Sequence, residues 1–309
     1  MTLFAVDAGG SRTRVLLAGK EVVELPSVNR HATGDLADDA LREVFELVRH
    51  NGAVAGWFAS ASVDPEHVED ELERVRCAAS GVGGHVVVSN DVVPLLWGVP
   101  ELAGGGVVAV CGTGSGFLGA DGRGRVARAG GCEYLGSDEG GAVDIGWRGL
   151  RAAVRSLDGR GGATTLVDAL GGDVTRLARD LAARPFPKQG LANLAGAVCA
   201  AWVRGDHVAG EVVDAAVGEL VAGVRAVRHR LGLPDGFAVA TTGGVLTGCP
   251  ELQRELTARL RAEADAGVVV AVEETARVVL AALERLVDAD RRPALPEGIA
   301  GRHAWLLAG

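Results

Sequence analysis

Two aspartates stand at places in the sequence where a carboxylate could serve phosphoryl transfer: Asp7 ends the apolar run LFAVD, and Asp91 follows the apolar run HVVVSN. A third, Asp138, lies in the glycine-rich stretch AGGCEYLGSDEGG, where acids suggest a ligand with hydroxyl groups, a cation or a metal. A carboxylate can hold magnesium beside a phosphate, or accept the proton of a substrate hydroxyl. Phosphoryl transfer needs both of these functions, together with donors that position the phosphates.

The turn after Asp7 offers such donors. Between the runs LFAVD and TRVLLAG, backbone amides of a glycine-rich turn would form a concave surface suited to phosphate. The residues assigned to this surface are Gly9, Gly10, Ser11, Arg12 and Thr13. An acid beside a bound phosphate favours Mg2+, so Asp7 is our candidate metal ligand. The alternative is that Asp7 only caps the hairpin by accepting hydrogen bonds from backbone amides.

Two further glycine turns follow apolar runs. The turn in AVCGTGSGF repeats the strand-turn-strand pattern of the N-terminus, which indicates that the two halves of the chain arose by duplication. Its hydroxyl groups and amides could form a second set of donors to the same polyphosphate. At the end of FAVATTGG, Gly243 and Gly244 lack side chains, so an adenine ring could lie flat against their backbone. The residues assigned to these turns are Gly112, Thr113, Gly114, Ser115, Gly243 and Gly244. Each turn taken alone is equally compatible with an ordinary connection between elements.

Asp91 is our candidate general base. In VVVSNDVVPLLWG, Asn90 and Asp91 follow an apolar strand and would emerge from a sheet edge, Asn90 toward the substrate. A carboxylate close to a substrate hydroxyl can accept its proton as the phosphoryl group is transferred. The alternative is that Asp91 is the N-cap of a helix that has Pro94 in its first turn. Both roles could hold at once.

Composition favours a small-molecule partner. The 309 residues are 48% hydrophobic and carry a formal net charge of -9, which leaves no basic footprint for nucleic acid or for an acidic membrane. No apolar run approaches the roughly 20 residues of a membrane-spanning helix, and the N-terminus lacks a signal-peptide pattern, so we expect a cytoplasmic protein. The five cysteines are widely separated and without CxxC spacing, which argues against a disulfide framework or a compact metal site.

The apolar patterns predict an α/β protein. A hairpin is expected over residues 3–19, and three strands joined by tight turns over 106–131. Further strands are expected at 53–60, 85–91, 237–244 and 267–272, and helices at 37–52, 65–79, 251–264 and 273–289, with mainly helical structure over 141–230.

These blocks, in this order, resemble the BadF/BadG/BcrA/BcrD-type ATPase family and, within it, the N-acetylglucosamine kinases of the actin, sugar kinase and heat-shock chaperone superfamily. DAGGSRTR and CGTGSGFLG look like the two phosphate motifs, VSNDVVPLLWG like the region of the catalytic aspartate, and TTGGVLTG like the adenosine motif. AGGCEYLGSDEGGAVDIG is similar to the sugar-recognition segment, and PSVNRHATG to a loop whose asparagine contacts the sugar. The resemblance implies that Asn29 and Asp138 hold sugar hydroxyls, with Tyr134 in the same segment, and it extends to about residue 290.

One departure from the family concerns the acceptor. Cys132 and Glu133 stand where the resembled segment usually has tryptophan and glycine. A charged side chain is costly to bury without a partner. Glu133 therefore points to solvent, bonds local amides, or meets an amine or an extra hydroxyl of the ligand, and the sequence leaves these three alternatives open.

The resemblance implies two actin-like, hexokinase-like domains of the ribonuclease H-like kind that close on ATP and Mg2+. We expect residues 1–106 to form the first, with the sugar-binding loop, and 107–309 the second, with a helical insertion and a last helix that could pack back on the first. The implied activity is ATP-dependent phosphorylation of a hydroxyl on a sugar, amino sugar or related polyol, in a homodimer. The alternatives are an ATPase that activates a 2-hydroxyacyl-CoA dehydratase, which would need cysteines for an iron–sulfur cluster, and a non-catalytic sugar sensor.

Overall fold

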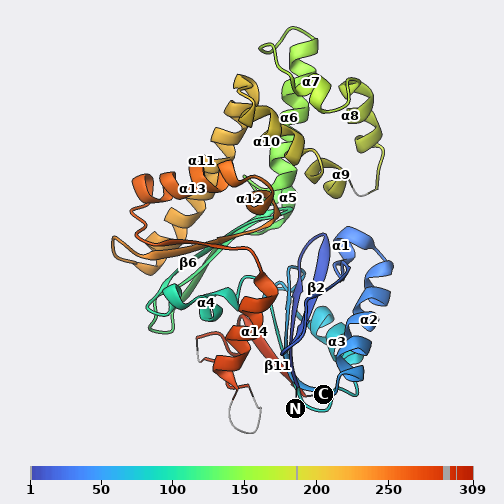
Figure 1. Ribbon diagram of the computed structural model, residues 1–309, viewed down its shortest axis with the longest axis vertical. Coiled ribbons are helices and arrows are strands. Elements are labelled where there is room, and N and C mark those ends of the chain that lie inside the picture. Colours follow the sequence, from blue (N-terminus) through green and yellow to red (C-terminus); the bar gives the residue numbers. More distant parts are fainter. Residues whose placement is uncertain (1, 186, 288–292, 297, 309) are drawn as a thin grey trace. The chain divides into compact units, whose positions relative to one another are not determined.

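The computed structural model describes residues 2–185, 187–287, 293–296 and 298–308. By its internal contacts the chain divides into two units (Figure 1). Unit 1 comprises Met1–Gly106, Gly119–Val126 and Glu274–Gly309, and unit 2 comprises Val107–Leu118 and Ala127–Glu273. The predicted domain boundary at residue 106 stays a prediction.

Unit 1 contains a six-stranded sheet in the order β11-β5-β4-β1-β2-β3. Its strands are β1 (Thr2–Ala8), β2 (Arg12–Leu17), β3 (Val23–Pro26), β4 (Ala53–Ser60), β5 (His85–Ser89) and β11 (Ala304–Ala308). The predicted hairpin is confirmed, since β1 and β2 are antiparallel with Asp7 opposite Arg14. Strands β1, β4 and β5 run parallel to one another, whereas β11, which the sequence patterns did not predict, runs antiparallel to β5.

Helices cover both faces of this sheet (Figure 1). Unit 1 contains α1 (Arg30–Thr33), α2 (Leu36–His50), α3 (Glu69–Ala78), α4 (Leu95–Gly98), the 3-10 helix η1 (Pro100–Leu102) and α14 (Thr275–Leu286). Helix α2 forms because its apolar side chains recur on one face, which is buried on the sheet. There Phe45 stacks on Phe58 and meets the edge of Phe4. Helix α14 packs on β1, so the last predicted helix is confirmed as far as Leu286.

Unit 2 is built around a five-stranded sheet in the order β10-β9-β6-β7-β8. Its strands are β6 (Gly106–Cys111), β7 (Ser115–Ala120), β8 (Val126–Gly130), β9 (Ala238–Thr242) and β10 (Val269–Val272). Strands β6, β7 and β8 are the three consecutive strands that the sequence predicts. The glycine turn of residues 112–114 therefore lies at a sheet edge, where a ligand can approach its backbone.

The predicted helical stretch of unit 2 is confirmed and forms a cluster around α6. The helices are α5 (Glu133–Gly136), α6 (Ala142–Leu157), α7 (Leu166–Ala169), α8 (Val174–Ala182), α9 (Lys188–Ala192), α10 (Ala195–Val203), α11 (His207–Leu231), α12 (Gly244–Gly248) and α13 (Pro250–Glu263). Helices α6 and α9 approach closely because Gly146 has no side chain: a Cβ there would lie 2.0 Å from the carbonyl oxygen of Leu191. This contact fixes the position of α9, which begins with Lys188.

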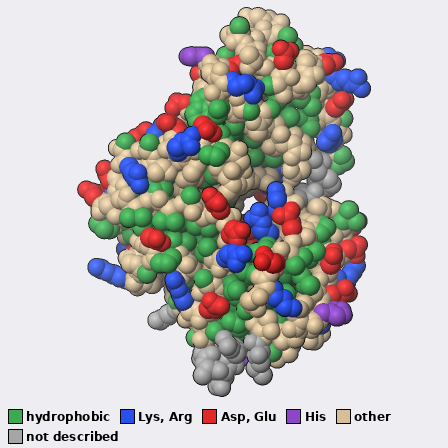
Figure 2. All heavy atoms as spheres, viewed as in Figure 1, with side chains coloured by type: hydrophobic (Ala, Val, Ile, Leu, Met, Phe, Trp, Pro, Cys, Tyr) green, Lys and Arg blue, Asp and Glu red, His purple; other side chains and the backbone are tan. Residues whose placement is uncertain are grey.

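Side chains of both charges are interspersed on the face of the molecule that Figure 2 shows. Among the described residues, no helix combines the length and the apolar character that crossing a membrane requires.

Candidate functional site

The parallel strands of unit 1 bring three predicted site residues to one sheet edge. Asp7 near the end of β1 is in register with Ala59 near the end of β4, and Ala59 with Ser89 at the end of β5. Asn90 and Asp91 directly follow β5. Strand β3 is antiparallel to β2 and thus runs in the direction of β1, so the loop with Asn29 leaves from the same edge. Asp7, Asn29 and Asp91 therefore share this edge, where a nucleotide and an acceptor could meet.

Asp7 is held by side chains of other elements. Its carboxylate accepts a hydrogen bond from the hydroxyl of Thr275, the first residue of α14, and lies 3.9 Å from a guanidinium nitrogen of Arg14. Burial raises the pKa of Asp7, whereas the Thr275 hydroxyl and the Arg14 charge oppose that rise. The side chain remains 14% exposed, so one carboxylate oxygen could still reach a ligand.

The donor set at Asp7 fits magnesium. Magnesium is commonly bound by one or two carboxylates together with phosphate oxygens and water. Among the described residues, no group of three or more His, Cys, Asp or Glu side chains could hold a metal by itself. A magnesium ion at Asp7 would therefore depend on the nucleotide phosphates for further ligands, as in other phosphoryl transfer sites.

The turn of residues 9–13 is exposed at its middle and buried at its end. Gly9 is half-buried, and an added Cβ would meet nothing closer than the carbonyl oxygen of Arg12 at 3.7 Å. Ser11 and Arg12 are exposed, and Arg12 donates to Glu24 on β3 at 3.0 Å. Thr13 is fully buried, and its hydroxyl accepts a hydrogen bond from the amide of Val28. The Thr13 side chain thus binds the loop that carries Asn29, and the role of Thr13 in nucleotide binding stays a prediction.

The loop around Asn29 is tied to the same turn. Ser27 is buried; its hydroxyl donates to the carbonyl oxygen of Gly9 at 3.2 Å and accepts from the amide of Asn29 at 3.2 Å. The hydroxyl of Thr33 donates to the carbonyl oxygen of Asn29 at 3.1 Å. Asn29 itself is buried, so its side chain leaves from a well-fixed backbone.

Asp91 lies in a turn, three residues before the N-cap position of the following helix. Helix α4 begins only at Leu95, and its N-cap position is Pro94. The neighbouring Asn90 bonds the backbone instead: its side chain accepts from the amide of Val92 and donates to the carbonyl oxygen of Val63 at 3.1 Å. These bonds hold the turn, in which Asp91 lies half-buried two residues after β5, a position that a general base could occupy.

In unit 2 the turn of residues 112–115, the second predicted phosphate turn, is in contact with Asp138. Gly114 lies directly under the Asp138 carboxylate, since an added Cβ would lie 2.2 Å from Asp138 Oδ2. The hydroxyl of Ser115 donates to the carbonyl oxygen of Glu139 at 2.7 Å. The carbonyl oxygens of Gly112 and Thr113 accept from the first two amides of α6, at 2.9 and 3.1 Å. The turn is therefore hydrogen-bonded to the start of α6 and packed against the Asp138 carboxylate.

Glu133 has a partner that the sequence did not predict. Lys188 Nζ lies 2.6 Å from Glu133 Oε2 and 3.8 Å from Asp138 Oδ2, and also lies 6.0 Å from the centre of the Tyr134 ring. Burial raises the pKa of Asp138, and the ammonium of Lys188 opposes that rise. Lysine occurs at only two positions in the chain, but no local spacing connects Lys188 with a segment 55 residues earlier. Thr275 was missed for the same reason, being 268 residues from Asp7.

The two glycines predicted for the adenosine turn differ in their surroundings. Gly243 has a φ of 120°, and a Cβ on it would lie 2.2 Å from the carbonyl oxygen of Cys111. This glycine is required for the close approach of the turn to the end of β6. Around Gly244 nothing lies within 4 Å of the added Cβ. Of the two positions, only Gly244 is open to a ligand.

Sequence comparison identifies the family. The model of the BadF/BadG/BcrA/BcrD ATPase family matches residues 6–263. The chain belongs to this family. This family member is similar to the N-acetylmuramic acid/N-acetylglucosamine kinase of Clostridium acetobutylicum, with 28% identity over 276 residues that cover 82% of this chain and 88% of the relative.

Structural comparison supports the predicted fold. The structure is similar to a provisionally assigned N-acetylglucosamine kinase from Porphyromonas gingivalis, with a TM-score of 0.71, 17% identity, and coverage of 92% of this chain and 99% of the other. It is also similar to a hexokinase from Schistosoma mansoni, with a TM-score of 0.53, 13% identity, and coverage of 91% and 84%. The predicted α/β fold of the actin-like, hexokinase-like kind is thereby confirmed for this BadF/BadG/BcrA/BcrD family member.

Proposed function

We propose that this protein is an ATP-dependent carbohydrate kinase, which transfers the terminal phosphoryl group of ATP to a hydroxyl of a sugar, amino sugar or related polyol. The observation that carries the proposal is the shared sheet edge of Asp7, Asn29 and Asp91. Membership of an ATPase family and the similarity to a kinase of amino sugars support it. The interspersed charges and the net charge of -9 also fit a small-molecule partner better than a polyanion.

Each predicted residue has one role in this proposal. Asp91 accepts the proton of the acceptor hydroxyl, and Asp7 holds Mg2+, which neutralises phosphate charge when bound. Asn29 of unit 1 and Asp138 of unit 2 are the residues proposed for acceptor hydroxyls, and Asn90, Glu133 and Tyr134 are further candidates for acceptor binding. The phosphate turns are residues 9–13 and 112–115, and Gly243 and Gly244 form the adenosine turn.

N-Acetylglucosamine and N-acetylmuramic acid are the acceptors we propose first, because the relative from Clostridium acetobutylicum is named for both. A homodimer and a location in the cytoplasm remain further parts of the proposal. The rival role as a dehydratase activator needs cysteines that can reach a cluster. Cys111, Cys199 and Cys249 are buried, and the exposed Cys77 and Cys132 lie in different units. These positions favour the kinase.

The test is acceptor-dependent release of ADP. A panel of amino sugars, neutral sugars, cyclitols and nucleosides is screened with the native protein, and the best acceptor is then used with Asp91→Asn. The amide keeps the shape of the side chain but accepts no proton, so we expect turnover to fall by about 10²- to 10⁴-fold with ATP affinity unchanged within about threefold.

The control variant is Asp70→Asn, which makes the same chemical change on the exposed surface of α3 and should leave turnover unchanged. Near-normal turnover of Asp91→Asn would exclude Asp91 as the base. Absence of acceptor-dependent ADP release across the panel, with iron in the purified protein, would favour the activator role instead.

A further inference from the structure

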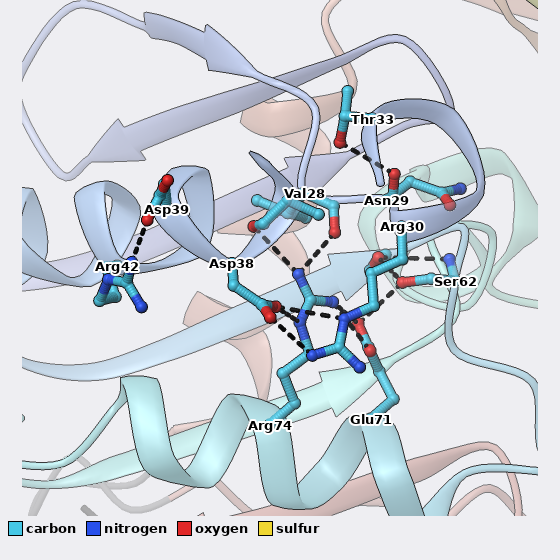
Figure 3. Close-up of polar contacts among 12 residues, drawn as sticks. Val28, Asn29, Arg30, Thr33, Asp38, Asp39, Arg42, Ser62, Glu71 and Arg74 are labelled. Carbon is cyan, nitrogen blue, oxygen red and sulfur yellow. Dashed lines mark hydrogen bonds and ion pairs between the residues drawn. The ribbon is translucent and has the colours of Figure 1, made fainter. Parts of the chain in front are cut away.

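Arg74 on α3 connects three segments of unit 1 with one nearly buried guanidinium group (Figure 3). Its Nε donates to Asp38 Oδ1 at 2.6 Å, and its Nη1 donates to both carboxylate oxygens of Glu71 at 2.9 and 3.0 Å. Its Nη2 donates to the carbonyl oxygens of Val28 at 2.7 Å and Ala37 at 3.0 Å. An arginine has five N–H donors, so this side chain is fully engaged.

The charge of Arg74 is balanced within the same cluster. The Arg74 side chain is 7% exposed, and a buried charge is tolerated when it is paired and its hydrogen bonds are made. Glu71 also accepts from the hydroxyl of Ser62 at 2.8 Å, and Asp38 also pairs with Arg30 at 2.7 Å. Ser62 and Arg30 thus fix the two carboxylates that bind Arg74. The positions of these carboxylates in turn fix the direction of the N–H donors of Arg74.

One of those donors acts on the peptide group that precedes Asn29. The carbonyl oxygen of Val28 belongs to the planar peptide unit that ends at the amide of Asn29. Arg74 binds this oxygen, and the hydroxyl of Ser27 binds that amide. The amide of Val28 is held in turn by Thr13 at 3.2 Å. Arg74 and Ser27 therefore hold the two ends of the Val28–Asn29 peptide, and Arg74 contributes the charged contact that fixes its orientation.

We propose that Arg74 is a positioning residue for the acceptor, which acts by holding the Val28–Asn29 peptide so that Asn29 is oriented before the sugar binds. The proposal rests on the function proposed above, in which Asn29 binds an acceptor hydroxyl. A preoriented group spares the free energy of ordering the loop upon binding. Removing the restraint should weaken acceptor binding, while ATP binding, which does not use Asn29, should be little affected.

The variant that tests this role is Arg74→Lys. Lysine keeps the positive charge but has a compact ammonium, which cannot reach two carboxylates and two carbonyl oxygens in the planar arrangement of a guanidinium. In the variant, Asn29 must be ordered when the acceptor binds, which lowers the affinity for the acceptor but not the rate of the bound complex. We expect the KM for the acceptor to rise by about tenfold, with the KM for ATP and kcat unchanged within about threefold.

Arg49→Lys is the matched control. Arg49 also connects α2 with the region of α3, since its guanidinium donates to the carbonyl oxygens of Ala78 at 2.8 Å and Ser80 at 3.0 Å. Those acceptors lie at and beyond the C-terminal end of α3, away from the loop with Asn29. This control should lower the midpoint of thermal unfolding like Arg74→Lys and leave the acceptor KM within about twofold. An equal rise of the acceptor KM in both variants would overturn the proposal.

A double-mutant cycle with Asn29→Ala separates positioning from general destabilisation. If Arg74 acts through Asn29, Arg74→Lys should have no further effect on the acceptor KM in the Asn29→Ala background. Multiplying effects in the double variant would overturn the positioning role. An unchanged acceptor KM in Asn29→Ala alone would instead contradict the proposed role of Asn29, so the two failures are distinguishable.

Should Arg74→Lys not fold, Glu71→Gln provides the second variant. The amide keeps the shape of Glu71 but offers Arg74 one acceptor oxygen in place of two, and we expect a rise of about threefold in the acceptor KM with the KM for ATP unchanged. A parallel rise of both KM values, or no rise in either, would contradict the proposal.

Discussion

Lys188 forms an ion pair with Glu133, with 2.6 Å between Nζ and Oε2. Lys188 is the better buried partner, 20% exposed against 52% for Glu133, and it also faces Asp138. The Glu133 side chain can therefore move out of the ion pair into solvent, whereas Lys188 stays beside Asp138, the carboxylate proposed to bind the acceptor. Because Lys188 balances the charge of Glu133 before any ligand is bound, Glu133 has less need of an amine on the acceptor than the sequence alone implies.

This pair predicts how the kinase responds to charge on its acceptor. Glu133→Gln should free Lys188 and favour N-acetylmuramic acid, which carries a carboxylate, over N-acetylglucosamine. Lys188→Met should do the reverse. An exposed ion pair is worth up to about 1 kcal/mol, so we expect the ratio of the two kcat/KM values to change by about fivefold in each direction.

The measurement is the ratio of kcat/KM for the two sugars in the native protein and both variants. The alternative left open by the sequence, in which Glu133 binds an amine of the acceptor, predicts a different result. It requires Glu133→Gln to lower the preference for glucosamine over N-acetylglucosamine by about tenfold, since one charge-assisted hydrogen bond is lost. The pairing with Lys188 predicts that this second ratio changes by less than about threefold.

The two phosphate turns should respond differently to an added methyl group. In the sequence Gly9 and Gly114 look equivalent. In the structure a Cβ on Gly114 would lie 2.2 Å from the Asp138 carboxylate, whereas a Cβ on Gly9 has its nearest neighbour at 3.7 Å. Gly114→Ala should displace Asp138 and raise the acceptor KM by about tenfold, and Gly9→Ala should change it by less than about twofold. Steady-state kinetics with each substrate varied in turn decides this, and equal effects of the two variants would contradict it.

The hydroxyl of Thr275 should contribute to the use of magnesium. It donates to the Asp7 carboxylate and so orients the proposed ligand. Thr275→Val keeps the shape of the side chain and removes the hydrogen-bond donor. Loss of a hydrogen bond to a metal ligand typically lowers the metal affinity by about 10- to 100-fold. We therefore expect the half-saturating magnesium concentration to rise by about tenfold.

Thr275→Ser, which retains the hydroxyl, should behave like the native protein in the same magnesium titration of ATP turnover. Binding of magnesium-free ATP, measured by calorimetry, should be similar in all three proteins. If the serine variant lost as much magnesium affinity as the valine variant, packing at the start of α14 and not the hydrogen bond would be the cause.

Local patterns were sufficient to predict most of the fold. The two apolar runs on either side of the glycine turn in LFAVDAGGSRTRVLL predict a hairpin, and the structure has β1 and β2 as an antiparallel pair. The site residues on strand ends, Asp7 and Asp91, follow from the same patterns because a strand end is marked by its own sequence. Strand β11 was missed because AWLLA is short and its strand character depends on antiparallel pairing with β5, 215 or more residues earlier in the chain.

The partners of the site residues could not be predicted, since they depend on packing between distant segments. Lys188 reaches Glu133 from α9, which lies against α6 where Gly146 has no side chain. Arg74 reaches the carbonyl oxygen of Val28 across 46 residues, and nothing near Arg74 in the sequence marks that contact. Charge and residue type suggested which side chains could do chemistry, while the groups that orient them are a property of the tertiary structure.

The pH dependence of acceptor phosphorylation should report the contact between Lys188 and Asp138. Burial raises the pKa of Asp138, the Lys188 ammonium lowers it, and the carboxylates of Glu133 and Glu139 raise it. Asp138 accepts a hydrogen bond from a sugar hydroxyl best when it is ionised. The value of kcat/KM should therefore fall as the pH drops through the pKa of Asp138. Lys188→Met removes an influence that lowers this pKa, and the acid limb of the profile must therefore move to higher pH.

The matched control for that profile is Lys20→Met, which removes the other lysine of the chain, an exposed residue of unit 1. Profiles of kcat/KM for a neutral acceptor are measured at constant ionic strength, so that screening of the ion pairs stays the same. Glu133→Gln provides a second test with the opposite expected shift. Loss of this neighbouring negative charge should lower the pKa of Asp138 and move the acid limb to lower pH, whereas Lys188→Met should move it to higher pH. If both variants shifted the limb in the same direction, or neither did, the acid limb would belong to a group other than Asp138.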